Sequence, residues 1–593
     1  MKKSIKLMAA GMLMVAMTSC DDMFTPAIEN IKDETTMENE ANYADQILGS
    51  AYILMPYSSS PYNDVATDDA VSNDLSNTWL TMAGGAWTSQ TGVSNDNWRD
   101  RIASIQFINI FLKNLDKVTF STTEKLNKMF QDRLRGEALG LRALNMYFLL
   151  QNYGGKSASG ELLGVHIFTE PYDATVDMNL PRNTFKECLD QLIADANEAV
   201  DLLPNTYVNL SSNNQVPQKY IAIGADVADY NRVFGANTHI RMCGRVAAAI
   251  RAQAALLAAS PAFEESGMTW AQAADYSAIV LDQIGGVAGL CPTGHLWYTA
   301  EQVGNASNTE DHAEIIWRER AGTSCSLEED NFPPSLYGKG RVNPTQNLVD
   351  AFPALNGYPI SDSRSNYNAN DPYSNRDPRL NYYIVTNGST MGISGNVINS
   401  SVHTPENAND KDGLNTENGT STRTGYYMRK LMRNDVNPNS ANKVEKDHYT
   451  KRIRFTELFL AYAEAANEAW GPTGKGSHGY SAYEVIKAIR QRAGIGTENG
   501  DAYLEEAKGS AETMRTLIRN ERRLELCFEN LRFWDLRRWK ADLNEAARGM
   551  RIEGNTYQTF EVEKRNFAPY MIYGPIPYND VLKFSNIEQN AGW

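Results

Sequence analysis

The chain has 593 residues, of which 72 are acidic and 56 are basic, so its formal net charge at neutral pH is −16. A surface this acidic argues against nucleic acid as a partner, because phosphate binding requires clustered Lys and Arg. The length could hold several average domains or one large helical unit.

The first 19 residues have the pattern of a secretory signal peptide. Three lysines form a basic start, residues 7–17 form an apolar stretch too short to remain across a bilayer, and small residues precede Cys20. This site resembles a bacterial lipobox, although Met17 stands where Leu is usual. We predict that the mature protein begins at Cys20 and carries acyl chains there, which anchor it to a membrane. The alternative is an ordinary secretory signal in which Cys20 is incidental.

No later segment approaches the roughly 18 to 20 apolar residues of a spanning helix, so we expect a soluble body tethered by its N-terminus. The other cysteines are widely scattered and form no Cys-x-x-Cys spacing. We interpret them as buried small apolar residues, not as a disulfide framework or a metal site. They are Cys188, Cys243, Cys291, Cys325 and Cys527.

Helical periodicity recurs along the chain. The strongest pattern is 133–153, where apolar residues recur at i, i+4 and i+7 until Gly154-Gly155 end the run. Thr184 is a predicted N-cap. The other predicted helices are 42–57, 97–118, 184–203, 239–259, 270–284, 455–470, 482–493 and 511–528.

Long polar stretches separate these helices and are rich in Asn, Ser, Thr, Gly and Tyr. They cover residues 56–96, 205–237, 291–344 and 360–451. Loops of this length inside a compact body usually hold function or small appended strands. The small residues at 135–143 and 461–469 are typical of tetratricopeptide-like helix packing, although no clean repeat period is present.

Short motifs occur in a fixed order over nearly the whole chain. Those of the N-terminal half are Ala66-Thr67-Asp68-Asp69, Trp87-Thr88, Trp98 with Asn109, Leu141-Arg142-Ala143 and Tyr153-Gly154-Gly155. Those of the C-terminal half are 344–352, 376–379, Arg454 with 461–465, 489–495, 520–526, 532–539, 575–577 and 590–593. Together they resemble the SusD/RagB family, surface lipoproteins that pair with a TonB-dependent outer-membrane transporter in Bacteroidetes. The family often has Pro in place of Ala591.

The resemblance implies a mostly α-helical fold, a SusD-like superhelix of tetratricopeptide-like helix pairs with long loop-rich insertions and a few short strands. It implies an N-terminal half at 20–240 that carries the ligand loops and a C-terminal half at 241–593, which form one globular unit. Asp21-Asp22 resembles the export signal that places such lipoproteins on the extracellular face of the outer membrane. A SusC-like TonB-dependent transporter is the implied partner.

A dense set of charged residues near the C-terminus could be interpreted as an acid/base site. Carboxylates and guanidinium groups alternate there on consecutive turns, which favours ion pairs between packed helices over catalysis. The set comprises Glu521, Arg522, Arg523, Glu525, Arg532, Asp535, Arg537 and Arg538. We interpret Arg376-Asp377-Pro378-Arg379 in the same way.

Signatures of enzymes and metal sites are incomplete. Gly155-Lys156-Ser157 ends like a phosphate-binding loop, but Leu150 occupies the position of its first glycine. The seven histidines are dispersed. Asp410-Lys411-Asp412-Gly413 begins like a calcium loop, yet Gly419 stands where the closing Glu belongs. We expect no cofactor and no catalytic metal; a structural Ca²⁺ is left open without support.

The loop around Trp79 is the first candidate ligand site. Asn73, Asp74 and Asn77 precede Trp79 in a polar segment, where the resembled family places a stacking aromatic residue. An aromatic ring can stack on the apolar face of a sugar while amides and carboxylates pair with hydroxyls. The alternative is that Trp79 forms an edge of the core.

A second candidate region lies between residues 297 and 337. It contains Trp297, Tyr298, Asn331, Phe332 and Tyr337. Phe332 and Tyr337 stand among Pro and Gly, so we expect both to be exposed.

These features favour a non-catalytic, surface-tethered protein that captures oligosaccharide and acts as a lid on the transporter. Three alternatives remain open from the sequence. One is a peptide-capturing lid of the RagB kind. Another is a surface glycoside hydrolase that uses carboxylates such as Asp68 and Asp69, although such pairs must flank one bond at roughly 5 to 9 Å. The third is a structural repeat protein that docks partners through its helices.

Overall fold

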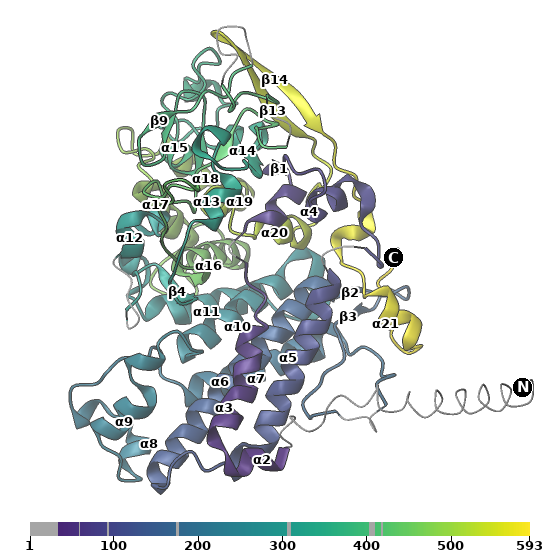
Figure 1. Cartoon of the computed structure of the whole chain (residues 1–593), viewed down its shortest axis with the longest axis vertical. Helices are drawn as coiled ribbons and strands as arrows, with labels where there is room; N and C mark the ends of the chain where they lie inside the picture. The colour runs from purple at the N-terminus through teal and green to yellow at the C-terminus, as the bar shows by residue number, and fades with distance from the viewer. Residues whose placement is uncertain are drawn as a thin grey trace, which may run out of the picture.

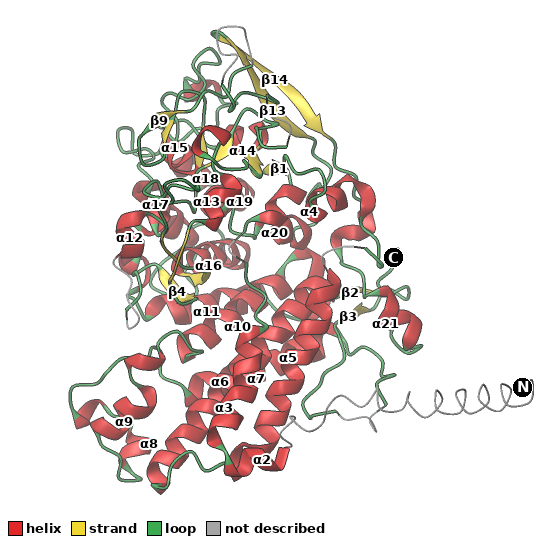
Figure 2. Cartoon of the chain, in the orientation of Figure 1, coloured by secondary structure: helices red, strands yellow, loops and turns green. Residues whose placement is uncertain are grey.

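A computed structural model describes residues 34–58, 60–91, 94–172, 177–304, 310–402, 410–416 and 419–593. The predicted signal peptide, Cys20 and Asp21-Asp22 lie outside these residues, so the lipid anchor stays a prediction. Helices dominate and strands are short, as predicted (Figure 2). No helix within the described part of the chain is both long enough and apolar enough to cross a membrane.

Long helices form one half of the molecule (Figure 1). They pack in succession, since α3 contacts α5, α5 contacts α6, α6 contacts α7, α7 contacts α10 and α10 contacts α11. Their bounds are α3 (Ala41–Ile53), α5 (Ser94–Asn114), α6 (Glu124–Tyr153), α7 (Phe185–Leu202), α10 (Gly244–Ala259) and α11 (Trp270–Asp282). The chain continues this packing with α16 (Phe455–Trp470), α17 (Ala482–Arg492), α19 (Ala511–Leu526) and α20 (Arg532–Arg538).

Small residues let these helices approach closely. Every residue of α10 except Arg245 is buried. On α6, a Cβ atom added to Gly140 would lie 2.6 Å from the side chain of Met242, so a larger residue would require Met242 to shift. The predicted cap Thr184 accepts a hydrogen bond from the Glu187 amide at 3.2 Å and completes a capping box.

Two helix starts differ from the sequence prediction by more residues than the others do. Helix α6 begins at Glu124 instead of 133, because Leu126 and Met129 continue its buried face through a stretch that looks polar in sequence. Helix α10 begins at Gly244 instead of 239, because residues 236–238 form a separate 3-10 turn.

The loop-rich stretches hold short helices and paired strands, and many of these elements form the other half of the molecule (Figure 1). The helices are α2 (Glu34–Asn39), α4 (Thr78–Thr81), α8 (Gln218–Ile221), α9 (Val227–Phe234), α12 (Ala300–Gly304), α13 (Ser326–Asn331), α14 (Gln346–Ala351), α15 (Arg379–Tyr383), α18 (Ala502–Ala507) and α21 (Tyr578–Lys583). All strand pairs among the described residues are antiparallel.

Some strand pairs join segments that are far apart in sequence, and others are local hairpins. They are β1 (Ala70–Ser72) with β6 (Val342–Pro344), β2 (Gly155–Lys156) with β3 (Leu162–Leu163), β4 (Ile315–Arg318) with β12 (Lys451–Arg454), β5 (Gly322–Ser324) with β11 (Lys446–His448), β7 (Ile384–Val385) with β10 (Tyr427–Met428), β8 (Thr390–Met391) with β9 (Asn396–Val397), and β13 (Ala547–Glu553) with β14 (Thr556–Glu563). One apolar cluster reaches from Met37 to Ile576, and a second lies among the short elements.

A buried ion-pair network ties the C-terminal helices to the short elements. Arg379 lies 2.6 Å from Glu521 and 2.9 Å from Glu525, and all three side chains are fully buried. Arg454 lies 2.7 Å from Glu314 and 2.9 Å from Glu529. The predicted structural role of these charges is therefore confirmed by their mutual pairing.

A second group in the network confirms the same interpretation with one correction. Arg522 and Arg538 both pair with Asp535, at 2.7 and 2.8 Å. Arg537 was expected to pair with a carboxylate as well, and this expectation is wrong. Its guanidinium carbon lies 3.3 Å from the ring centroid of Phe533 and 5.1 Å from that of Trp87, so aromatic rings surround this cation.

The free cysteines Cys188, Cys243, Cys291, Cys325 and Cys527 are all buried, as predicted.

Replacing Glu525 by Gln should destabilise the fold in a pH-dependent way. Burial alone would raise the pKa of Glu525, but Arg492, Arg454 and Arg379 outweigh it and lower the pKa from 4.5 to about 2. Loss of the charge strands these arginines and should cost about 3 to 5 kcal/mol of unfolding free energy near neutral pH. Because the folded-state pKa is depressed, the wild-type advantage is complete above about pH 4.5 and disappears as the pH falls through about 2.

Chemical denaturation of both proteins across this pH range measures the difference. Glu512→Gln is the matched control, because Glu512 is exposed on the same helix, and its effect should stay near zero. Equal unfolding free energies of wild type and Glu525→Gln at pH 7 would contradict the structural role.

Candidate functional site

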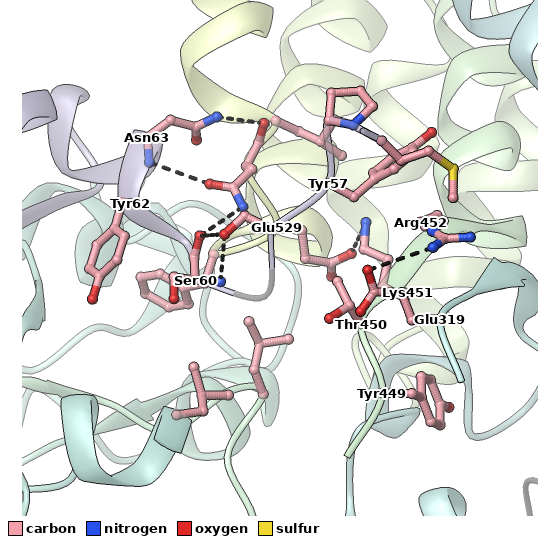
Figure 3. A pocket seen from close by; sticks show the side chains of 18 of the residues that line it. Tyr57, Ser60, Tyr62, Asn63, Glu319, Tyr449, Thr450, Lys451, Arg452 and Glu529 are labelled. Carbon is pink, nitrogen blue, oxygen red and sulfur yellow. Dashed lines mark hydrogen bonds and ion pairs between the residues drawn. The ribbon is translucent and has the colours of Figure 1, made fainter. Parts of the chain in front are cut away.

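A cavity of about 700 Å³ lies where the long helices meet the short elements. One wall comes from the end of α3 with residues 54–58 and from α5 and α6. Another comes from β5, β11 and β12, and a third from residues 528–534. Figure 3 shows part of this lining, with Tyr57, Tyr62 and Tyr449 around the space.

Aromatic side chains line much of the cavity. They come from distant parts of the sequence and are Tyr57, Tyr62, Trp79, Tyr147, Phe148, Trp297, Tyr298, Tyr449, Phe528 and Trp534. Polar groups lie between them, including Ser60, Asn63, Asn97, Gln151, Glu319, Arg320 and His448. Rings beside hydrogen-bonding groups can hold a ligand that has both apolar faces and hydroxyl or amide groups.

Three of the predicted site residues line this cavity, namely Trp79, Trp297 and Tyr298. Trp79 is half-buried in α4, and its ring stands edge-on to Phe533 with the centroids 5.0 Å apart. Trp79 therefore packs against the core and also lines the cavity, and its role in ligand binding stays a prediction.

Trp297 and Tyr298 are more enclosed than Trp79. Trp297 is 4 % exposed and stacks on Tyr449 with centroids 5.7 Å apart, and its indole N–H has no hydrogen-bond partner. The Tyr298 hydroxyl donates to the carbonyl of Tyr382 at 3.0 Å, so this group is already engaged.

The polar residues predicted beside Trp79 do not line the cavity; each organises the local chain. The Asn73 amide donates to the carbonyl of Lys339 at 2.8 Å. Asp74 accepts from the Ser76 amide at 3.0 Å, and Asn77 accepts from the Leu80 amide at 3.1 Å as the N-cap of α4.

The prediction that Phe332 is exposed is wrong, because Phe332 is 1 % exposed in the second apolar cluster. The turn after α13 folds back over it, and the Gly340 amide donates to the Phe332 carbonyl at 3.0 Å. Asn331 is also fully buried, and its side chain bonds the Leu327 carbonyl and the Val342 amide. Tyr337 is 61 % exposed as predicted, but it does not line the cavity.

Several cavity residues were not identified from the sequence. Trp534 stood inside the block interpreted as structural, and Tyr57 and Tyr449 stood in long polar stretches. The sequence pattern that could have identified them is an aromatic residue in a polar loop, but many other tyrosines of this chain also fit that pattern. Only the meeting of distant segments distinguishes these rings.

Asp68 and Asp69, which the glycoside-hydrolase alternative would use for catalysis, form ion pairs with arginines instead. Asp68 and Asp69 are buried and lie 2.8 and 2.6 Å from Arg523, and Arg532 lies 3.0 Å from Asp68. Although burial raises the pKa of Asp68, these two arginines lower it below its ordinary range. Neither carboxylate lines the cavity, so this pair supplies no acid and base there.

The calcium-like segment is also engaged in protein contacts. Asp412 accepts a hydrogen bond from the Ser335 amide at 2.8 Å, and burial raises the pKa of its carboxyl group. Among the residues whose structure is described, no three His, Cys, Asp or Glu side chains gather as a metal site. The absence of a cofactor stays a prediction.

Comparison with known proteins assigns the fold to a family. A sequence model of the SusD family matches residues 297–593. The chain belongs to the SusD family. A second model, described as starch-binding associating with outer membrane, matches residues 24–222. A search of curated proteins finds no match.

Solved SusD-like structures cover nearly the whole chain. A SusD-like protein from Bacteroides fragilis is 21 % identical over 96 % of this chain and 100 % of its own, with a TM-score of 0.70. A SusD-like carbohydrate binding protein from the same species is 19 % identical over 93 % and 99 %, with a TM-score of 0.66. Surface glycan-binding protein A from Bacteroides fluxus is 17 % identical over 93 % and 100 %, with a TM-score of 0.57. At these identities the similarity establishes the SusD-like helical fold.

Replacing Phe332 by Ala should lower stability without acting on the cavity directly. Loss of a fully buried Phe side chain costs about 3 to 5 kcal/mol. Thermal and chemical unfolding measure the change. Tyr337→Ala is the matched control from the same loop, and its effect should stay within about 0.5 kcal/mol because the ring is exposed. A Phe332→Ala protein as stable as wild type would contradict this assignment.

Proposed function

We propose that this protein is a non-catalytic glycan-binding lipoprotein of the cell surface. It captures an oligosaccharide in the cavity that Trp79 lines and delivers it to a SusC-like TonB-dependent transporter, on which it acts as a lid. The observation that carries the proposal is the meeting of aromatic rings and hydrogen-bonding groups in one cavity of about 700 Å³.

The chemistry of the cavity supports a sugar ligand. Ring faces can cover the apolar faces of sugar units, and amides, hydroxyls and charged groups can bond the sugar hydroxyls. Two of the structurally similar proteins are named for carbohydrate or glycan binding. The pairing of Asp68 and Asp69 with arginines supports binding without hydrolysis.

Calorimetry on the chain from Asp21 onward tests the proposal. Plant, fungal and host-mucin oligosaccharides form one panel, and peptides of similar mass form a second. Saturable binding of an oligosaccharide supports the proposal. Binding of peptides alone would support the peptide-capturing alternative, and new reducing ends during incubation would contradict the absence of catalysis.

Replacing Trp79 by Ala should weaken oligosaccharide binding by about 1.5 kcal/mol or more, which is roughly tenfold. The indole face offers stacking area that a methyl group cannot replace. Calorimetry against the bound oligosaccharide measures the change, and melting curves check that the loss of the Phe533 contact leaves the fold intact.

Trp79→Phe should retain part of the affinity, and Tyr337→Ala should retain all of it because that ring lies outside the cavity. Equal affinity of wild type and a folded Trp79→Ala protein would remove Trp79 from the site.

Replacing Cys20 by Ser should release the protein from membranes, because acyl anchoring at this residue would be lost. Cell fractionation measures the release. Cys325→Ser is the control, since it removes a buried thiol elsewhere and should leave the protein membrane-bound. A double Asp21→Ala, Asp22→Ala protein should stay lipidated but lose antibody labelling on intact cells. Membrane association of Cys20→Ser that matches wild type would contradict the anchor.

A further inference from the structure

Some buried arginines in this chain have several acceptors, whereas others, such as Arg537, have side-chain nitrogens without a hydrogen-bond partner. Arg379 and Arg454 each contact several carboxylates, at distances that begin at 2.6 and 2.7 Å. Arg182 and Arg376 instead donate to carbonyl oxygens of several residues. Acceptors or aromatic rings offset the hydration that a buried cation loses, and Arg537 has the rings of Phe533 and Trp87.

Arg101 of α5 differs from these residues. It is 2 % exposed, and only its Nη2 has a partner, the carbonyl oxygen of Leu54. Its Nε and Nη1 are buried without any hydrogen-bond acceptor. The neighbouring carboxylate of Asp100 lies 3.1 Å from Arg99. Burial lowers the pKa of Arg101 to about 10, so the group stays charged at neutral pH while its charge is poorly compensated.

Arg101 lines the cavity that we assign to the ligand. Asn97, Asp100 and Arg101 lie three and four residues apart along α5, which places them on one helix face, and all three line the cavity. The nearby Tyr57 hydroxyl is also buried without a hydrogen-bond partner. Burial raises the pKa of Tyr57, so this hydroxyl keeps its proton and can donate it in a hydrogen bond.

A second incompletely paired arginine comes from β12. The Nε of Arg452 is buried without a partner, and its nearest carboxylate, Glu319, is 3.6 Å away. Figure 3 shows Arg452 and Glu319 beside Tyr57 in the cavity lining. Arg101 and Arg452 both act electrostatically on Tyr57, so the three groups belong to one region.

Two carboxylates of the lining act on these arginines, since Asp100 interacts electrostatically with Arg101 and Glu319 lies 3.6 Å from Arg452. The other carboxylates of the lining have other partners. Glu529 is held by Arg454, Lys430 and Lys451 at 2.9, 2.6 and 2.9 Å. Glu457 accepts from the Gln253 amide at 2.6 Å. Arg320 is exposed at the cavity and adds another positive charge. The charges that lack close partners in this lining are therefore positive.

We propose that Arg101, Arg452 and the Tyr57 hydroxyl form an anion-binding subsite, which takes the carboxylate of a uronic acid or a sulfate ester of an acidic oligosaccharide. This inference rests on the proposed glycan-binding function and names its ligand class. A guanidinium group matches the geometry of a carboxylate or sulfate through two parallel hydrogen bonds. Since Nε and Nη1 of Arg101 are covered by neighbouring atoms, binding includes a rotation of this side chain toward the ligand.

The acidic surface of the protein does not prevent such a ligand from binding. At physiological ionic strength, charges separated by more than about 8 Å of solvent are largely screened, whereas a contact inside the cavity is screened much less. The local arginines therefore decide the preference, and the net charge of the whole chain does not.

Two pairs of probes test the inference by calorimetry on the full-length protein purified in detergent. The first pair is hexagalacturonate and its methyl ester, which tests a carboxylate. The second pair is a chondroitin sulfate hexasaccharide and its desulfated form, which tests a sulfate. We expect at least one charged probe to bind ten or more times more tightly than its modified partner, and we expect this preference to weaken between 0.05 and 0.5 M salt.

Variants locate the preference on the protein. Arg101→Gln should reduce the preference for the charged probe to about twofold or less. Arg101→Lys should retain part of this preference, because lysine keeps the positive charge but lacks the two parallel N–H donors of a guanidinium group. Arg99→Gln is the matched control, since Arg99 is exposed on the same helix and does not line the cavity. If Arg101→Gln does not fold, Arg452→Gln provides the same test from β12.

Each result supports or overturns the inference. Equal affinity for charged and modified probes, or an undiminished preference in a folded Arg101→Gln protein, overturns it. If neutral oligosaccharides bind through Trp79 and charged ones bind no more tightly, the anion-binding subsite is wrong and the proposed glycan-binding function stands. Absence of binding to every oligosaccharide overturns both. If the protein binds acidic peptides through Arg101 but binds no oligosaccharide, a sugar is the wrong ligand class for both the proposed function and the subsite.

Discussion

The buried ion pairs of Arg454 are the constraint on which the cavity depends. Arg454 ends β12 and contacts Glu314 before β4, Glu525 in α19 and Glu529 after α19. These contacts join three segments that are remote in sequence and would otherwise be free to separate. Because Glu529 and its neighbours also line the cavity, the same pairs hold one wall of the site in place. Removing one partner would leave the others charged in a medium that cannot hydrate them.

Charged groups in this molecule thus fall into two populations. Those of the network are buried and form close ion pairs with one another, and the arginines around Glu525 lower its pKa, which keeps it ionised. Those of Arg101 and Arg452 are buried but incompletely paired, and they lie in the wall of a cavity. The first population stabilises the fold. The second leaves hydrogen-bonding capacity that a ligand can use.

The helices and their packing could largely be predicted from the sequence. The period of apolar residues in 133–153 and the cap at Thr184 are local signals, and the structure confirms both. The alternation of carboxylates and guanidinium groups in 521–538 also indicated mutual pairing, since such charges are stable inside a protein only together. Arg537 shows the limit of this argument, because aromatic rings that lie far away in sequence replaced the expected carboxylate.

The sequence by itself determined the helical class, the positions of most long helices, the family resemblance and the presence of aromatic residues in polar loops. Only the tertiary structure decided which aromatic residues face a cavity. Phe332 and Trp79 both stand in polar segments of the sequence. In the structure, the turn after α13 encloses Phe332, whereas Trp79 is half-buried and lines the cavity. The physical reason is that the exposure of a side chain depends on what packs against it. Tyr57 and Trp79, for example, pack against Trp317 and Phe533, which lie far away in the sequence.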